Sequence, residues 1–422
     1  MRQIPCDLAV IGGGPAGLAA AVEAKRQGVD RVVVIERDIA PGGILRQCVH
    51  DGFGLHRFGQ RMTGGQYAQA FIDQAVDCGV EFLTDTMVLE VTQDRRVYAV
   101  GKKTGMLELS CGAVILAMGC RERTRSQVFL YGTRPSGVMT AGAAQRYINI
   151  DGYLPGKRAV ILGSGDIGLI MARRMTLEGM EVEGVYEVMP NLGGLRRNAV
   201  QCLEDYDIPL HLSTTVTWIH GEKRLEGVTV SQVDAQRKPI SGTERYIPCD
   251  LLVLAVGLIP ENELSKQAGI QLDPVTKGPV VDESCMTSVE GIFAAGNVAA
   301  VFDLVDYVSQ TGEQAARGAA KYLAGRLDTT SPYLALRPGE NTGVILPQRV
   351  RPTNLEGEAL PVFLRVTTPI RNSALECTGT DGAVACRRRY PVALPPEMLC
   401  CEIPKEKITS ALTISVKEAV VG

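Results

Sequence analysis

The chain has 422 residues, of which 45% are hydrophobic and 22% are charged, and its formal net charge is -3. This length exceeds the roughly 250 to 300 residues at which a single core stops growing, so we expect two or three domains. The composition is typical of a soluble globular protein, and the charge balance argues against nucleic acid or a membrane surface as a partner.

Neither a leader peptide nor a membrane-spanning helix is expected. The apolar run after Arg2 contains Gly12-Gly13-Gly14-Pro15 and lacks a cleavage-like exit. No other apolar stretch approaches the roughly 18 residues that span a bilayer. We therefore expect a cytoplasmic protein.

Twelve cysteines are scattered through the chain, with no C-x-x-C pair and only Cys400 and Cys401 adjacent. This pattern predicts neither a zinc site nor a disulfide framework, so no metal ion is expected. Most of these thiols are expected to pack as small apolar side chains in a reducing compartment.

The first segment reads as a strand, a tight glycine turn, an alanine-rich helix running to Gly28, and the strand RVVVIE. Its turn carries G-x-G-x-x-G at Gly12, Gly14 and Gly17. The first glycine permits the turn, the second lets backbone amides approach a pyrophosphate, and the third lets helix and strand pack closely. The phosphates would lie at the helix N-terminus. Glu36, nineteen positions after Gly17, can accept hydrogen bonds from both hydroxyls of an adenosine ribose.

The same pattern recurs in the middle of the chain. Glu187 again falls nineteen positions after the last glycine, so the sequence predicts a second bound dinucleotide. A carboxylate at this ribose position repels a 2'-phosphate and favours NAD(H) over NADP(H), although Arg196 and Arg197 follow nearby and can soften that preference. The second glycine motif consists of Gly163, Gly165 and Gly168.

Two further buried strands end in small-residue turns, Ala117-Met118-Gly119 and Ala255-Val256-Gly257, which we interpret as crossovers between domains. A third segment, GIFAAGN, reads as a short strand and a glycine turn. A long helical pattern follows it from about Thr311 to Leu323.

This ordered set of motifs resembles the flavoprotein oxidoreductases with two dinucleotide-binding domains, a group that includes thioredoxin and glutathione reductases. The resemblance covers about residues 5 to 325. It implies an α/β fold with two Rossmann-like three-layer dinucleotide-binding domains, the NAD domain being inserted in the FAD domain. The FAD-binding domain is expected at 1–124 and 256–330, and the NAD(H)-binding domain at 125–255.

In that group the chain returns to the FAD domain at a motif that here reads TSVEGIFAAGN, Thr287 to Asn297. Asn297 replaces the group's aspartate, which removes a charge near the flavin but keeps a group that can donate and accept hydrogen bonds. Carried over position by position, the resemblance implies that the cofactors contact Gly12, Gly14, Pro15, Ala16, Gly17, Glu36, Arg37, Gly43, Ile44, Gln47, Val88, Ala117, Gly119, Gly163, Gly165, Asp166, Ile167, Gly168, Glu187, Gly257, Gly296, Asn297, Gln314 and Ala315.

The stretch GGILRQCVHDGFG contains a single cysteine where many of these flavoproteins keep a redox dithiol. Cys48 is the only cysteine between Cys6 and Cys78, and residues 125 to 250 hold no C-x-x-C, so dithiol chemistry is not expected. In an extended segment Cys48 and His50 point the same way, and both can face the flavin. The histidine would exchange a proton, and a cationic imidazole would lower the pKa of the thiol. Simple packing of both side chains is the alternative.

The fuller string around this stretch, together with RPSGVMTAGAAQ (Arg134 to Gln145), resembles a narrower bacterial subfamily. Its members are NAD- and FAD-linked partners of glycerol-3-phosphate-dehydrogenase-like flavoproteins. It is also similar to the alpha subunits of dye-linked amino-acid dehydrogenases, opine oxidases and hydrogen cyanide synthase, which implies work within a heteromeric complex.

The composition changes after about residue 330. TTSPYLALRPGENTG reads as a linker, and the remainder, rich in valine, threonine and proline, predicts a small β-rich C-terminal domain over 331–422. In the wider group this domain forms a subunit interface, which implies an oligomer.

The sequence thus predicts an FAD- and NAD(H)-dependent oxidoreductase that passes hydride between the two cofactors and exchanges electrons with a second flavoprotein subunit or another redox partner. Two alternatives stay open. One is a free-standing flavoenzyme that acts directly on a small molecule beside Cys48 and His50, and the other is a non-catalytic subunit that holds nucleotides for structure.

Overall fold

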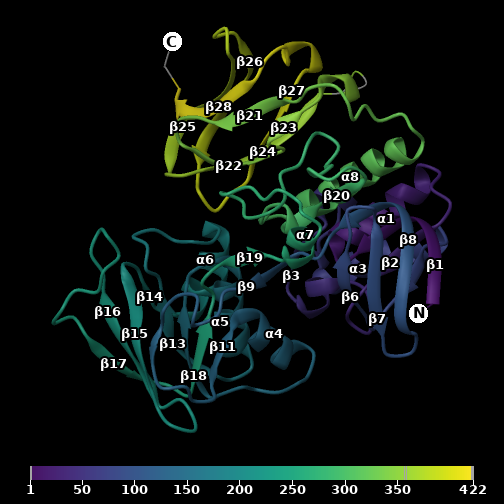
Figure 1. Ribbon diagram of the computed structural model, residues 1–422. Coiled ribbons are helices and arrows are strands. Elements are labelled where there is room, and N and C mark those ends of the chain that lie inside the picture. The colour runs from purple at the N-terminus through teal and green to yellow at the C-terminus, as the bar shows by residue number, and fades with distance from the viewer. Residues whose placement is uncertain (1, 356, 358, 420–422) are drawn as a thin grey trace. The chain divides into compact units, whose positions relative to one another are not determined.

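The computed structural model describes residues 2–355, 357 and 359–419, and the chain divides into two compact units (Figure 1). The second unit comprises Gln47–His50 and Arg121–Ile259, and the first comprises the rest of the chain. One α/β unit is therefore inserted in another, which confirms the predicted fold class. The junctions fall at Cys120/Arg121 and Ile259/Pro260, a few residues from the predicted 124 and 255. They lie there because the chain continues past the two buried strands into short extended crossovers, β9 (Cys120–Glu122) and β19 (Leu258–Pro260).

The first unit is built on a seven-stranded sheet in the order β5-β2-β1-β8-β7-β6, with β20 added beside the C-terminal half of β8. The strands β5, β2, β1 and β8 are parallel. Both faces of such a sheet are covered, which explains why VVVI in β2 is buried at every position. Its elements are β1 (Arg2–Ile11), α1 (Pro15–Arg26), β2 (Val32–Ile35), β3 (Asp51–Phe53), α2 (Leu55–Phe58), β4 (Met62–Thr63), α3 (Gly64–Asp77), β5 (Glu81–Leu83), β6 (Thr86–Val91), β7 (Arg96–Gly101), β8 (Gly105–Leu116), α7 (Glu263–Gln267), β20 (Ile292–Ala294) and α8 (Val305–Leu323).

Helices α1 and α8 pack with their backbones close together. A Cβ atom on Gly312 of α8 would lie 2.2 Å from the carbonyl oxygen of Ala16, so only glycine permits this approach. Helix α8 begins at Val305, six residues before the start that the helical pattern predicted. The longer helix places its first turns beside the third glycine segment.

The second unit has a five-stranded parallel sheet in the order β11-β18-β12-β13-β14 and a separate four-stranded sheet, β10-β15-β16-β17. Helix α5 contributes Leu169, Met171, Ala172 and Met175 to the buried core of this unit. The elements are β10 (Tyr131–Gly132), β11 (Val138–Thr140), α4 (Ala141–Asn149), β12 (Arg158–Leu162), α5 (Asp166–Leu177), β13 (Glu181–Tyr186), α6 (Arg196–Cys202), β14 (Leu210–His211), β15 (Thr214–His220), β16 (Gly227–Gln232), β17 (Arg245–Pro248) and β18 (Leu251–Leu254).

The C-terminal region, part of the first unit, contains two β-sheets around its own apolar core. One sheet has the order β23-β21-β28-β25-β26, and the other has the order β22-β24-β27. Its strands are β21 (Leu334–Pro338), β22 (Thr342–Leu346), β23 (Arg349–Val350), β24 (Leu360–Val366), β25 (Ile370–Gly379), β26 (Val384–Ala393), β27 (Leu399–Ile403) and β28 (Leu412–Glu418).

The expectation of a linker at TTSPYLALRPGENTG was wrong for the middle of that stretch and for its last two residues, which begin β22. Leu334–Pro338 forms strand β21, which pairs in parallel with β28, nearly eighty residues later in the chain. Proline and glycine gave the stretch a loop-like composition, but Pro338 is the last residue of the strand, where its missing N–H costs little.

Among the described residues, no helix is long and apolar enough to cross a membrane.

Candidate functional site

Steric crowding makes glycine necessary in the first glycine turn. Gly12 has φ +104°, and a Cβ atom there would lie 2.5 Å from the carbonyl oxygen of Ala117. A Cβ on Gly17 would lie 1.8 Å from the carbonyl oxygen of Gly12. The turn is therefore pressed between the end of β8 and the start of α1, as the fingerprint predicted.

Glu36 fixes the conformation of this turn from the end of β2. Its two carboxylate oxygens accept hydrogen bonds from the backbone N–H groups of Gly13 and Asp38, at 2.8 and 2.7 Å. Gly14 leaves open space where a side chain would be, and among the described residues no side chain caps the N-terminus of α1. Free helix amides beside an uncovered glycine suit an anionic pyrophosphate. We call Gly12–Gly17 with Glu36 the first cradle.

The second unit repeats this geometry at Gly163–Gly168 with Glu187, the second cradle. Gly163 has φ +103°, and a Cβ there would lie 2.2 Å from the carbonyl oxygen of Ala255. A Cβ on Gly168 would lie 2.5 Å from the carbonyl oxygen of Gly163. The Glu187 carboxylate accepts hydrogen bonds from the backbone N–H groups of Ser164 and Met189, both at 2.9 Å. The two cradles therefore use the same carboxylate-to-backbone contacts.

Two side chains of the second cradle have contacts that the motif did not predict. The Ser164 hydroxyl donates to Glu187 at 2.8 Å and accepts from the N–H of Gly193, also at 2.8 Å. Asp166 Oδ1 accepts from the N–H of Leu195 at 2.8 Å. The segment after β13 is thereby fastened to the glycine turn. The one signal for these contacts in the sequence is that the motif GSGD contains a hydroxyl, on Ser164, and a carboxylate, on Asp166, which can both form hydrogen bonds.

The third glycine segment lies against the first cradle. Gly296 has φ +67°, and a Cβ there would lie 2.7 Å from the Cβ of Ala16. The amide of Asn297 accepts from the N–H of Phe302 at 3.0 Å and donates to the sulfur of Cys120 at 3.6 Å. An aspartate could still accept the hydrogen bond from Phe302, but it has no N–H to donate to Cys120. The amide of Asn297 therefore makes a structural contact that an aspartate could not make.

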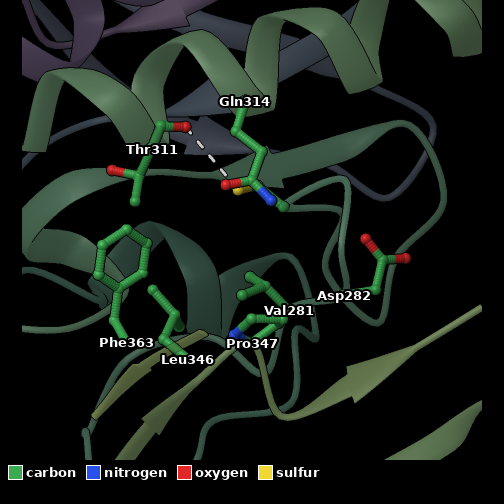
Figure 2. A pocket seen from close by; sticks show the side chains of 8 residues that line it. Val281, Asp282, Thr311, Gln314, Leu346, Pro347 and Phe363 are labelled. Atoms are coloured by element: carbon green, nitrogen blue, oxygen red, sulfur yellow. Dashed lines mark hydrogen bonds between the residues drawn. The ribbon is translucent and has the colours of Figure 1, made fainter. Parts of the chain in front are cut away.

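Gln314 of α8 has its amide engaged within the protein. Its Nε2 donates to the carbonyl oxygen of Glu283. Figure 2 shows Thr311 and Gln314 on one side of a cavity of about 10 Å³ and Leu346, Pro347 and Phe363 on the other. This volume holds about one water molecule. The cavity is therefore a packing defect beneath the C-terminal strands, and a cofactor contact from Gln314 stays a prediction.

The other predicted contact positions vary in exposure. Pro15 begins α1, and a Cβ on Gly43 would lie 3.0 Å from the Cα of Gly14, so Gly43 adjoins the first cradle. Ala16, Val88, Ala117 and Ala315 are buried, Ile167 is half-buried, Arg37 and Ile44 are exposed, and Gly119 and Gly257 have positive φ angles.

Gln47, Cys48 and His50 belong to the second unit, although they lie within the first segment of the sequence. Gln47 Nε2 donates to the carbonyl oxygen of Gly142 at 2.9 Å and to Gln145 Oε1 at 3.0 Å. Asn149 Nδ2 donates to the carbonyl oxygen of Gln47 at 2.8 Å. Helix α4 therefore holds this segment, and flavin contacts of Gln47, Cys48 and His50 stay predictions.

Cys48 is buried, with 8% of its surface exposed. Burial raises the pKa of its thiol to about 12, against a smaller lowering by a hydrogen bond with Gln145. The thiol is thus protonated at neutral pH and is a weak nucleophile. Its environment favours a packing role over a chemical one.

His50 is half-buried and lines a cavity of about 80 Å³ in the second unit. Asn149, Arg173 and Arg174 lie around the same cavity. Arg174 also pairs with Glu178 at 2.6 Å and donates to Asn149 Oδ1 at 2.9 Å. Val49, Ile170, Met171 and Leu177 also line the cavity, so His50 lies between polar or cationic side chains and apolar ones.

The other histidines pack against neighbouring side chains or lie at the surface. The ring of His211 stacks on Tyr186 with 4.7 Å between centroids, and burial lowers the pKa of His211. His220 shares a 2.7 Å hydrogen bond with Thr229. His56 is exposed on the short helix α2.

The chain has two equivalent cradles, one in each unit, and the second unit is inserted in the first. This arrangement can be compared with known protein families. The sequence profile described as pyridine nucleotide-disulphide oxidoreductase matches residues 6–320. The chain belongs to this family. As a member it is an oxidoreductase that depends on FAD and NAD(P)H, which confirms the predicted enzyme class and its two cofactors.

Several relatives are components of larger enzymes. The opine oxidase component that matches, from Agrobacterium tumefaciens (strain Ach5), is 29% identical over 313 residues, which are 70% of this chain and 61% of that protein. The HcnB component of hydrogen cyanide synthase from Pseudomonas protegens is 27% identical over 287 residues, 62% of this chain and 58% of that protein. The chain thus spans about three fifths of the length of these relatives.

The ferredoxin–NAD(+) reductase of a benzene 1,2-dioxygenase system also matches. It comes from Pseudomonas putida and is 26% identical, with 69% of this chain and 67% of that protein covered. Among solved structures, the T. acidophilum thioredoxin reductase has a TM-score of 0.61 at 25% identity, and the match covers 75% of this chain and 98% of that one. One known fold therefore accounts for three quarters of this chain.

Proposed function

We propose that this protein transfers hydride between NAD(H) and FAD and works as one subunit of a heteromeric dehydrogenase or reductase complex. The observation that carries the proposal is the pair of equivalent cradles, each with a buried glutamate bound to the backbone of its glycine turn. A chain that keeps both sites sterically intact is suited to hold two dinucleotides at once.

In this proposal the glycine turns and helix N-termini of α1 and α5 bind the pyrophosphates, while Glu36 and Glu187 bind the adenosine riboses. When bound, FAD and NAD(H) supply the hydride chemistry itself. The protein contributes positioning, since productive transfer requires reacting atoms about 3 to 3.5 Å apart. The remaining contact positions named above are proposed to complete the two cofactor sites.

We further propose that the second cradle prefers NADH. Glu187 is only 7% exposed and its carboxylate accepts three hydrogen bonds, so it stays in place at the ribose position. Arg196, one of the two cations that could offset its charge, pairs with Glu204 at 2.7 Å on the exposed surface of α6. The negative charge of Glu187 therefore faces a 2'-phosphate, and of these two cations Arg197 is the one left to oppose it.

Electron transfer to another subunit is favoured over internal dithiol chemistry. The sequence has no C-x-x-C pair, and Cys48 is a buried, protonated thiol. The opine oxidase, hydrogen cyanide synthase and dioxygenase relatives are each named as one component of a larger enzyme. A glycerol-3-phosphate-dehydrogenase-like flavoprotein is the partner that the narrower resemblance suggests, with the C-terminal region as the proposed interface.

The free-standing alternative places a small-molecule substrate beside His50. The cavity there is about 80 Å³. Ligand pockets for small molecules usually enclose about 300 to 1,000 Å³. A cavity of this size accommodates a few water molecules or a small anion, so the second unit alone offers little room for an organic substrate at His50.

Affinity capture of the chain from the cells that make it, followed by size separation, tests the proposal. The flavin content and the NADH turnover of each species are measured. The proposal predicts flavin in every species and turnover with natural acceptors only in the heteromeric one. Full turnover by the isolated chain would favour the free-standing enzyme, and a flavin-free complex would favour the non-catalytic role.

A further inference from the structure

The C-terminal region brings three cysteines together that the nucleotide chemistry does not use. The Sγ atoms of Cys377, Cys386 and Cys401 all lie within 4.8 Å of one another. They are separated by nine and fifteen positions in the chain, and none belongs to a C-x-x-C pair. We call these three residues the thiol cluster.

Strand pairing explains how the thiol cluster forms. Cys377 of β25 and Cys386 of β26 are directly opposite each other in an antiparallel pair, and a register irregularity follows immediately between Cys377 and Thr378. Such bulges redirect neighbouring side chains. Cys401 comes from β27, which belongs to the other sheet of this region and pairs with β24. The cluster therefore joins both sheets.

The spacing of the sulfurs suits a single ion. Three thiolates bound to one ion at about 2.3 Å in tetrahedral geometry are about 3.8 Å apart, within the observed limit. Cys377 and Cys401 are fully buried, whereas Cys386 is half-buried and offers a path of entry from solvent. Nearby, Arg388 donates from Nη1 to the carbonyl oxygen of Cys400 at 2.9 Å, so a positive charge adjoins the strand that carries Cys401.

From this geometry we propose that the thiol cluster binds one thiophilic d10 cation, Zn²⁺ or Cu⁺, and that the bound ion links the two C-terminal sheets. Soft thiolate ligands select these ions. Binding converts three thiols to thiolates and releases three protons, without oxidation or reduction of any group. Among the described residues no fourth histidine, cysteine or carboxylate joins the group, so Zn²⁺ takes water as its fourth ligand at the Cys386 side, and Cu⁺ needs none.

The test uses the 422-residue chain with its flavin bound, purified under reducing conditions and stripped of metal with a chelator. It is titrated with Zn²⁺ and, separately, with Cu⁺ under anaerobic conditions against a competing chelator, and bound metal is measured by mass spectrometry. One ion per chain is expected. Removal of a residue that merely supports a ligand costs about 10- to 100-fold in metal affinity, so Cys386→Ser and Cys401→Ser should each cost at least that much.

Cys400→Ser is the matched control. Cys400 neighbours Cys401 on β27, but its side chain packs against the larger core of the first unit. This variant should bind the ion with wild-type affinity. Cys386→Ala is a second variant at the half-buried ligand, where a truncated side chain is tolerated. It keeps the proposal testable if Cys401→Ser does not fold. Binding should also raise the unfolding temperature of the wild type but not of Cys386→Ala.

Three results would overturn the proposal. The first is binding of neither ion by the stripped wild type. The second is equal loss of affinity in Cys400→Ser and Cys386→Ser. The third is a disulfide within the cluster, detected by mass spectrometry in protein prepared with reductant, because a disulfide would remove two of the three ligands.

Discussion

Replacement of Glu187 by glutamine tests how the second cradle chooses its nucleotide. The carboxylate accepts hydrogen bonds from the N–H groups of Ser164 and Met189, both at 2.9 Å, and from the Ser164 hydroxyl at 2.8 Å. The single oxygen of a glutamine side chain can accept hydrogen bonds either from Ser164 or from Met189. Its NH₂ group then faces the backbone N–H of the other residue, which loses its acceptor. Leaving one buried donor without an acceptor costs about 1 to 3 kcal/mol.

The same substitution removes the charge that opposes a 2'-phosphate. At partly screened distances that repulsion is on the order of 1 to 3 kcal/mol, or roughly 5- to 150-fold in binding. NADH binding should suffer only from the backbone N–H that loses its acceptor. For NADPH, the removal of the charge repulsion should offset that loss. Glu187→Gln should therefore weaken NADH selectively and bring the NADH-to-NADPH ratio close to one.

Anaerobic stopped-flow reduction of the bound flavin by each nucleotide gives this ratio directly. Glu36→Gln is the matched control, because Glu36 has equivalent backbone contacts in the first cradle. It should weaken flavin retention and leave the nucleotide ratio unchanged. If Glu187→Gln keeps the wild-type ratio of the rates with NADH and NADPH, the charge of Glu187 does not determine the nucleotide preference. Arg196 and Arg197 would then be the next residues to test.

Three other outcomes follow from the site. Gly17→Ala should yield protein without flavin, because its Cβ would lie 1.8 Å from a backbone oxygen; Gly65→Ala on α3, where the added Cβ meets open space, should keep the flavin and change the unfolding free energy by less than about 1 kcal/mol. Because burial raises the pKa of Cys48 to about 12, its alkylation, followed by mass spectrometry, should rise tenfold per pH unit from about pH 8 to 10, as the thiolate fraction does; a rate that levels off as the pH passes the ordinary thiol value of 9.0 would contradict the burial argument. His50→Ala should keep FAD and slow turnover with the natural acceptor by about 10²- to 10⁴-fold if the imidazole exchanges a proton, whereas His56→Ala should have no effect, and equal rates in both would make the His50 stretch a packing element.

The sequence predicted the parts of the site that depend on contacts close in the chain. Gly12, Gly17 and Glu36 lie within one strand-turn-helix-strand unit, so their spacing alone indicates the turn, the close packing and the buried carboxylate. The same holds for the second cradle. These geometries are local consequences of backbone sterics, which explains why residue type and spacing identified them.

The remaining features depend on pairings between distant segments. The parallel pairing of β21 with β28 could not be predicted from a proline-containing stretch, because its partner strand is distant in the sequence. The grouping of Gln47 with Gln145 depends on how helix α4 packs. The thiol cluster requires the register of β25 on β26 and the packing of a second sheet, neither of which appears in cysteine spacing.

Anaerobic titration of the purified, metal-stripped protein with NADH, followed by flavin absorbance, asks whether both cofactors react on this one chain. We expect a yellow protein with one FAD per chain that one equivalent of NADH bleaches fully without any added partner. Protein that cannot be loaded with FAD, or bound flavin that excess NADH leaves oxidised, would contradict hydride transfer between two cofactors held by this chain.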